Sequence, residues 1–167
     1  KFFQITGYDV SKKKINELKK GIDLNNDITL TNKNTQNLIF TNEKKYLKGC
    51  DTFIVTVPTP ILKNNNPDLT ILNDAFKLIS KFLSKGNLII LESTVYPGLT
   101  EDLANKYFTK KLGFKLNADY FLGYSPERVN PGDSKKNIKN IKKIISASNK
   151  PALIKMKQIY SKIVKVG

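Results

Sequence analysis

Two short stretches of the sequence place acid and hydroxyl side chains directly after apolar runs. Residues 92–98 (ESTVYPG) combine a carboxylate with the hydroxyl of Thr94, and residues 124–131 (YSPERVNP) combine Glu127 with Arg128, the only arginine of the chain. A carboxylate at a strand exit can act as a general base or orient a water molecule. Arginine can bind a phosphate or carboxylate through two parallel hydrogen bonds. Both stretches therefore contain candidate catalytic or ligand-binding residues.

Each stretch also has a plain structural interpretation. A Pro-Gly pair after a polar strand exit is typical of a turn, and Glu127 with Arg128 could be a surface ion pair of little energetic value. The chain contains no histidine, so a serine nucleophile would lack its usual base. With no histidine and one cysteine, no set of metal ligands is predicted. The single cysteine, Cys50, precedes an apolar run and is predicted to be structural.

Two further polar positions follow apolar runs. Asp9 ends residues 5–9, where an acidic side chain can accept both ribose hydroxyls of an adenine dinucleotide. In a complete dinucleotide fold this acid comes about 20 residues after a Gly-rich loop, so Asp9 is either the acid of a truncated domain or an ordinary turn residue. Residues 57–60 (VPTP) predict either a rigid turn or a wall for a dinucleotide, with Thr59 offering a hydroxyl.

The hydrophobic pattern predicts the elements that position these loops. Apolar, β-branched runs predict strands over residues 5–9, 37–41, 53–57, 87–94, 119–127 and 141–148. Helical spacing predicts helices over residues 12–20, 42–50, 68–83, 100–112 and 151–164. Ser11 is the expected N-cap of the first helix and Gly21 its expected stop.

The alternation of these elements predicts the fold class. Strands that are apolar on both faces and alternate with helices are typical of a parallel sheet covered on both sides. We therefore expect an α/β fold, a doubly wound Rossmann-like sheet that is incomplete at its N-terminus. Ligands of such sheets bind beyond the carboxyl ends of the strands, so the polar loops should converge on one crevice.

Composition narrows the class of protein. The 167 residues predict one domain, and 40% hydrophobic with 26% charged residues is typical of a globular chain. No apolar run reaches the roughly 18–20 residues of a membrane span, and one cysteine favours a reducing, cytoplasmic location. The net charge of +15 comes from scattered lysines, which predicts a solvated surface rather than nucleic-acid binding.

Four motifs taken together resemble one enzyme family. They are GYDVSKKKINELKKG, CDTFIVTVPTP, ESTVYPG and GYSPERVNPGD. Their ordered set closely resembles the UDP-glucose/GDP-mannose dehydrogenase family, and is most similar to its branch acting on UDP-N-acetylhexosamines. The resemblance implies a Rossmann domain that binds NAD, a UDP-sugar substrate and a homodimeric parent protein. It also implies two successive oxidations of the sugar C6 hydroxyl to a carboxylate, through a cysteine thioester that water hydrolyses.

The resemblance also implies roles for individual residues. The cofactor-binding residues would be Asp9, Lys14, Val57, Pro58, Thr59 and Thr94. Asp9 would hold the adenosine ribose, and Lys14 would lie near the same ribose or the phosphates. Thr94 would position a water molecule or the nicotinamide. Glu127 would assist the attack of water on the thioester, and Arg128 would contact the substrate.

The sequence also departs from the family pattern. A Gly-rich loop does not precede Asp9, and the family's catalytic lysine, asparagine and cysteine have no counterpart before residue 167. Cys50 does not match that cysteine, and Pro131 stands where some relatives have a second acid. We therefore expect residues 1–167 to be a partial NAD-binding domain without the UDP-sugar-binding domain, inactive and weak in NAD binding by itself. The alternative is a non-catalytic nucleotide-binding module of Rossmann type.

Overall fold

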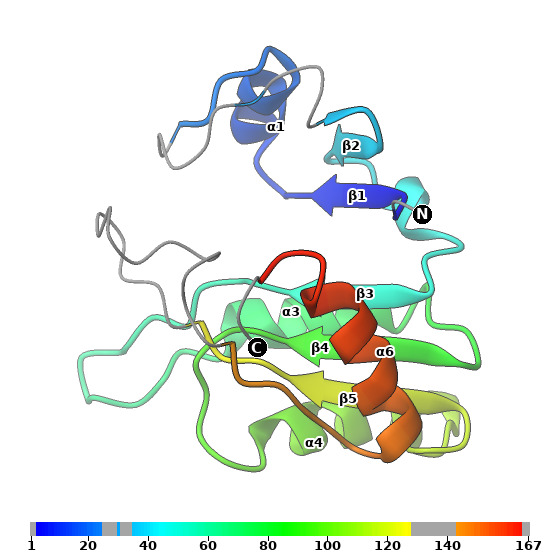
Figure 1. Cartoon of the computed structure of the whole chain (residues 1–167). Coiled ribbons are helices and arrows are strands. Elements are labelled where there is room, and N and C mark those ends of the chain that lie inside the picture. Colours follow the sequence, from blue (N-terminus) through cyan, green and yellow to red (C-terminus); the bar gives the residue numbers. More distant parts are fainter. Residues whose placement is uncertain (1–2, 25–29, 31–34, 128–142, 165–167) are drawn as a thin grey trace. The chain divides into compact units, whose positions relative to one another are not determined.

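The computed structural model describes residues 3–24, 30, 35–127 and 143–164 of the chain (Figure 1). It divides into two compact units, Lys1–Gly49 and Cys50–Gly167. Both units contain parallel strands with helices packed on them, as the alternating sequence pattern predicts. Within the described residues, no helix is long and apolar enough to cross a membrane.

The first unit is a β-α-β unit with one short additional helix. Strands β1 (Ile5–Tyr8) and β2 (Leu38–Thr41) pair in parallel, and the connection between them contains helix α1 (Lys12–Lys19). A 3₁₀ helix, η1 (Lys44–Leu47), follows β2 where a short helix was predicted. Helix α1 buries Ile15 almost completely.

Helix α1 begins and ends at the residues that the sequence predicts. The Ser11 hydroxyl accepts a hydrogen bond from the backbone N–H of Lys14 at 3.2 Å, which satisfies one of the free donors of the first turn. Gly21 follows the helix with φ of +83°, a left-handed conformation that glycine adopts without steric cost. Asp9 therefore lies in a short loop fixed by a strand on one side and a capped helix on the other.

The second unit contains a four-stranded sheet in the order β3-β4-β5-β6. Its strands are β3 (Thr52–Val55), β4 (Asn87–Leu91), β5 (Tyr120–Tyr124) and β6 (Ser146–Ala147). The first three pair in parallel, and β4 is buried along its whole length. This confirms a strand within the range predicted at 87–94, although β4 ends at Leu91.

Strand β6 differs from its prediction. It is only two residues long and runs antiparallel to β5, with Tyr124 opposite Ser146. A parallel neighbour would need a crossover connection, usually a helix, and the sequence predicts no helix between residues 127 and 141. The prediction of a parallel sheet was therefore wrong for this last strand.

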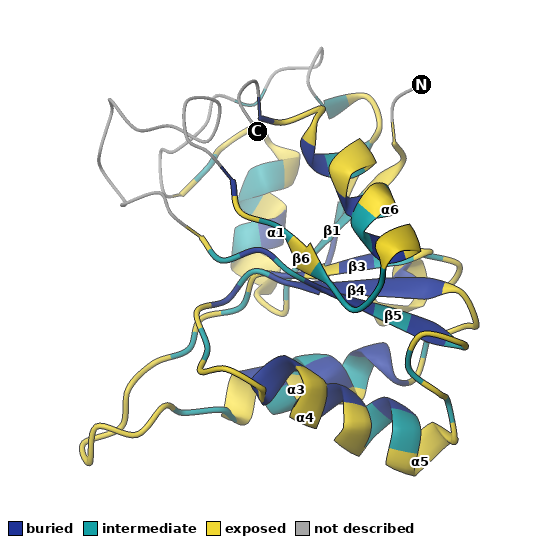
Figure 2. Cartoon of the chain, turned by 60° about the horizontal axis from the view of Figure 1, so that its bottom comes forward, coloured by how far each residue is buried: buried dark blue, intermediate teal, exposed yellow. Residues whose placement is uncertain are grey.

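Helices cover both faces of the second sheet (Figure 2). Helices α3 (Thr70–Ile79), α4 (Leu99–Ala104) and α5 (Lys110–Leu112) lie on one face, and α6 (Lys150–Tyr160) lies on the other. The predicted single helix over 100–112 is interrupted by a π-helical segment, Asn105–Thr109. This arrangement confirms the doubly wound class.

Aromatic packing fixes the interrupted helix to the sheet. Phe108 in the π-helical segment is fully buried, stacks on Phe76 with ring centroids 5.5 Å apart, and meets Tyr120 edge-on at 5.3 Å. Offset-stacked and edge-to-face rings are the favoured aromatic geometries. The three rings join α3, the π-helical segment and the start of β5, the strand that leads to Glu127.

Replacing Gly123 with Ala should destabilise the second unit by about 1–3 kcal/mol, because the new methyl group overpacks a filled core. A Cβ at this position in β5 would collide with the Met156 sulfur of α6 and lie 3.3 Å from Ile90 Cγ1. Urea unfolding measures this loss in the free energy of unfolding. In a Met156→Ala background the same substitution should cost less, and an equal cost in both backgrounds would contradict this explanation.

Candidate functional site

The loops after β3 and β4 are tied together by side-chain hydrogen bonds. The Thr59 hydroxyl donates to the backbone carbonyl of Thr94 at 3.0 Å, and the Ser93 hydroxyl donates to the carbonyl of Val57. Two prolines flank Thr59, so its loop cannot continue the sheet. The VPTP and EST motifs, 35 residues apart in sequence, therefore form one surface at the carboxyl end of the sheet.

A pocket of about 340 Å³ opens beside this surface. Its lining is mostly apolar and consists of Thr59, Ile61, Pro67, Leu69, Thr94, Val95, Tyr96 and Leu99. Binding sites for small molecules are typically apolar cavities of this scale with a few polar groups that fix orientation. Two predicted site residues, Thr59 and Thr94, belong to this lining, and each has a hydroxyl group.

Glu92 and Glu127 lie beside each other at the exits of β4 and β5. The N–H of Glu127 donates to the carbonyl of Glu92 at 3.2 Å, and the N–H of Glu92 donates to the carbonyl of Val55 at 2.9 Å. The ladder between the strands thus continues beyond their ends. The backbone that carries Glu127 is fixed by the sheet, not by a free loop.

A lysine and a tyrosine complete this polar cluster. Lys143 Nζ lies 3.5 Å from Glu92 Oε1 and 3.7 Å from Glu127 Oε2. The Tyr160 hydroxyl donates to Glu92 Oε1. Burial, together with the hydrogen bond to Glu92 and its charge, raises the pKa of Tyr160 far above its usual value. Tyr160 therefore stays a neutral donor at any ordinary pH.

Sequence reasoning did not identify Lys143 or Tyr160 as site residues. Lys143 is one of many lysines in the chain and stands beside an apolar run, which gives no signal of its environment. Tyr160 shares the buried face of α6 with Ala152 and Met156 at intervals of four residues, so its burial could have been predicted. Its partner Glu92 is 68 residues away in sequence, and only the fold brings the two together.

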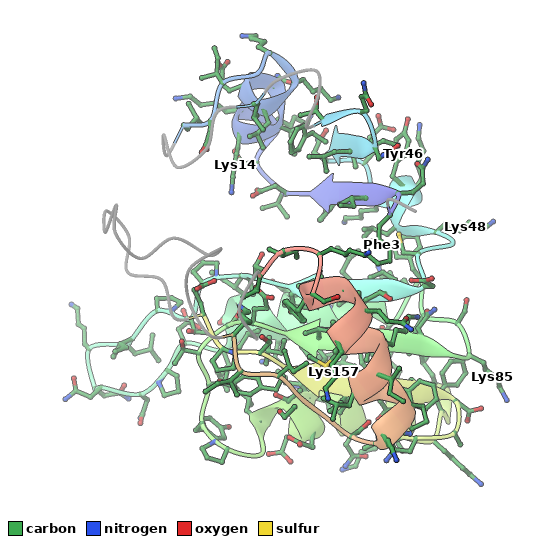
Figure 3. The ribbon with its side chains drawn as sticks, viewed as in Figure 1. Phe3, Lys14, Tyr46, Lys48, Lys85 and Lys157 are labelled. Carbon is green, nitrogen blue, oxygen red and sulfur yellow. The ribbon has the colours of Figure 1, made fainter. Side chains whose placement is uncertain are left out.

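The lysines named in Figure 3 show why Lys143 is unusual. Lys85 and Lys157 are both exposed, and Lys85 projects away from the ribbon of the second unit. Lys143 is the only charged residue that is buried among those the structure describes. Much of the positive charge is thus a solvated surface, as composition predicts, while one ammonium group is enclosed beside two carboxylates.

In the first unit, Asp9 is held by its own loop and by α1. One carboxylate oxygen accepts the N–H of Ser11 at 2.9 Å, and the other pairs with Lys14 Nζ at 2.9 Å. Burial acts to raise the pKa of Asp9, but the hydrogen bonds from Lys14 and Ser11 and the Lys14 charge outweigh it and hold that pKa below its usual value. Asp9 is therefore an ionised acceptor.

The chemistry of this pair fits the ribose end of a dinucleotide. A carboxylate offers about four acceptor positions, and Asp9 uses two of them for Ser11 and Lys14. The remaining positions can accept two ribose hydroxyls, while the Lys14 ammonium can donate to a neighbouring oxygen. Both residues were predicted as cofactor contacts, and the structure places them in contact with each other.

The other predicted residues are distributed as follows. Val57 and Pro58 continue the chain after β3, with Val57 half-buried and Pro58 exposed. Arg128, predicted to contact substrate, lies outside the described residues. Cys50 is half-buried, and burial with the nearby charge of Asp51 raises the pKa of its thiol, which disfavours the reactive thiolate.

Comparisons with known proteins agree over almost the whole chain. The family model described as UDP-glucose/GDP-mannose dehydrogenase family, NAD binding domain, matches residues 1–164. The chain is 41% identical over 165 residues to a UDP-N-acetyl-D-glucosamine 6-dehydrogenase of Salmonella typhi, covering 98% of this chain and 39% of that protein. It is 33% identical to a UDP-N-acetyl-D-mannosamine dehydrogenase of Methanococcus maripaludis, covering 97% of this chain and 37% of that protein.

Solved structures show the same extent of similarity. The structure of a UDP-D-ManNAc dehydrogenase from Pyrococcus horikoshii superposes with a TM-score of 0.85 at 27% identity, covering 98% of this chain and 40% of that chain. The chain thus spans 39% and 37% of the lengths of the two curated relatives named above.

Proposed function

Because this chain belongs to the UDP-glucose/GDP-mannose dehydrogenase family and matches its NAD-binding domain, we propose that it provides the cofactor site and a catalytic carboxylate of a UDP-N-acetylhexosamine 6-dehydrogenase. The reaction would oxidise the C6 hydroxyl of the sugar to a carboxylate, in the synthesis of polysaccharide precursors. The observation that carries this proposal is Glu127, whose backbone is hydrogen-bonded to Glu92 at the carboxyl end of the sheet.

The cofactor end of the proposed site belongs to Asp9 and Lys14. Asp9 accepts the hydroxyls of the adenosine ribose, and Lys14 keeps that carboxylate oriented through their 2.9 Å ion pair. NAD, when bound, accepts the hydride removed from the sugar carbon. Within the second unit, Val57, Pro58 and Thr59 would be cofactor contacts of their own, in a loop stiffened by the proline and by the Thr59 bond to the Thr94 carbonyl.

The chemical end of the proposed site belongs to Glu127 and Thr94. Glu127 is about half exposed, so its carboxylate is accessible to water. It acts as the general base that takes a proton from water as the water attacks the acyl intermediate. Thr94 lines the neighbouring pocket, and its hydroxyl orients the water or the nicotinamide amide. Arg128, the next residue in sequence, contacts the anionic part of the substrate.

The proposal is tested by measuring NADH formation with the polypeptide as its source organism makes it. UDP-N-acetylglucosamine and UDP-N-acetylmannosamine are the substrates to supply, with UDP-glucose for comparison. Turnover of an N-acetylated sugar with two NADH formed per sugar supports the proposal. NAD binding without turnover of any nucleotide sugar would favour the non-catalytic module instead.

Replacing Asp9 with Ala should weaken NAD binding by about 10- to 100-fold, because hydrogen bonds to a charged acceptor are worth about 1.5–3 kcal/mol. Isothermal titration calorimetry with NAD measures the change in the same polypeptide. Asp74→Ala, which removes an exposed carboxylate from α3, is the matched control and should leave the affinity unchanged. Equal NAD affinities of the two variants would show that Asp9 is not part of the cofactor site.

A further inference from the structure

Lys143 carries a positive charge in a place where charge is costly. Its side chain is 2% exposed, and among the described residues its Nζ has no hydrogen-bond partner. A buried ammonium that lacks hydrogen bonds is unfavourable unless opposite charges compensate it. The compensation comes from Glu92 and Glu127, each within 4 Å of the same nitrogen, and from the Tyr160 ring, whose centroid lies 5.6 Å away.

The two carboxylates around Lys143 have different surroundings. The Glu92 side chain is 15% exposed and already accepts the Tyr160 hydroxyl, whereas that of Glu127 is 45% exposed. Glu92 is therefore the more buried carboxylate and has a fixed hydrogen-bond donor, whereas the carboxylate of Glu127 is accessible to a ligand. Lys143 is in ionic contact with both carboxylates.

Two carboxylates at neighbouring strand exits repel each other, and a shared counterion offsets that repulsion. The charged or titratable side chains that the structure places around Lys143 are Glu92 after β4, Glu127 after β5 and Tyr160 of α6. Tyr160 is neutral and donates only to Glu92 in this cluster. Among the described residues of this cluster, Lys143 carries the positive charge that lies within 4 Å of both carboxylates.

We propose that Lys143 is a positioning residue for Glu127: the buried ammonium holds this carboxylate beside Glu92, where it can accept a proton from water. The inference rests on the proposed role of Glu127 in the dehydrogenase. Lys143 itself contacts neither substrate nor cofactor in this assignment. It acts through the ion pair, so its loss should change turnover rather than cofactor affinity.

Lys143→Met tests the proposal, because methionine has a similar length and no charge. In the polypeptide as its source organism makes it, kcat at neutral pH should fall by about 10- to 100-fold, the scale expected for a misplaced catalytic group. KM for NAD should stay within about twofold, since ground-state binding is not altered. Lys143→Arg should restore part of kcat by restoring the charge.

Lys155→Met is the matched control, because it removes the partly exposed partner of Asp51, a residue at the opposite end of the sheet. It should keep the wild-type kcat. A Lys143→Met enzyme with the kcat of this control overturns the inference. Absence of any turnover in the wild type would instead count against the proposed dehydrogenase function.

A second measurement does not depend on turnover. In thermal unfolding of the 167-residue chain, Lys143→Met should lower Tm, and the loss should be smaller when Glu92→Gln is already present, because less charge is left unpaired. Equal losses in the two backgrounds would show that the ion pair is not formed. Should Lys143→Met alone not fold, the Lys143→Met/Glu92→Gln enzyme replaces it, and a kcat equal to that of Glu92→Gln overturns the positioning role.

Discussion

Replacing Glu127 with Gln should lower kcat by about 10²- to 10⁴-fold, the usual contribution of a general base. The amide keeps the shape of the side chain but cannot take a proton from water. The hydrogen bond from the Glu127 N–H to the Glu92 carbonyl involves only backbone atoms, so it persists in the variant. KM for NAD should therefore stay within about twofold, because the lost interaction belongs to the transition state.

This effect is measured as steady-state NADH formation, with the polypeptide as its source organism makes it. Rapid mixing then follows NADH formation in the first turnover. If Glu127 acts in the hydrolytic step, the variant should still form NADH in a first burst before turnover slows. Glu101→Gln, which changes an exposed carboxylate in the first turn of α4, is the control and should retain kcat. A Glu127→Gln enzyme with the kcat of this control would show that another group is the base.

Replacing Phe108 with Ala should destabilise the second unit by about 3–5 kcal/mol, the cost of deleting a large buried side chain and leaving a cavity. Phe108 is fully buried between Phe76 and Tyr120, so the variant loses both ring contacts as well as apolar burial. The midpoint of urea unfolding should fall accordingly.

Tyr96→Ala is the comparison for this prediction, since Tyr96 is a large aromatic residue that is 47% exposed. Exposed substitutions away from special features usually change stability by about 0.5 kcal/mol or less. A similar small loss for Phe108→Ala would mean that the three rings do not form the packed joint between α3, the π-helical segment and β5.

The sequence by itself was sufficient for the features that depend on neighbouring residues. The apolar run at 87–91 predicted β4 because a strand buried on both faces needs apolar side chains at every position. Ser11 and Gly21 marked the two ends of α1 because capping depends on side chains within three or four residues. The motifs around Asp9, Thr59, Thr94 and Glu127 likewise lie directly at or after strand ends, as predicted.

Other features were decided by contacts between distant residues. The direction of β6 depends on its pairing with β5, and its own two residues contain no information about that choice. The π-helical segment breaks the regular spacing of the predicted helix at 100–112, where Phe108 packs between Phe76 and Tyr120. A periodic pattern of apolar residues cannot reveal either result.

The polar cluster of Glu92, Glu127, Lys143 and Tyr160 shows most clearly what could not be predicted from the sequence. Glu92 was visible as an acid in a motif, but Lys143 and Tyr160 looked like a surface lysine and a core aromatic residue. These two residues join the polar cluster only in the fold, because the sheet brings the exits of β4 and β5 beside α6. Lys143 Nζ is enclosed there within 4 Å of two carboxylates. The strength of a charge interaction depends on distance and burial, and those two quantities exist only in the folded chain.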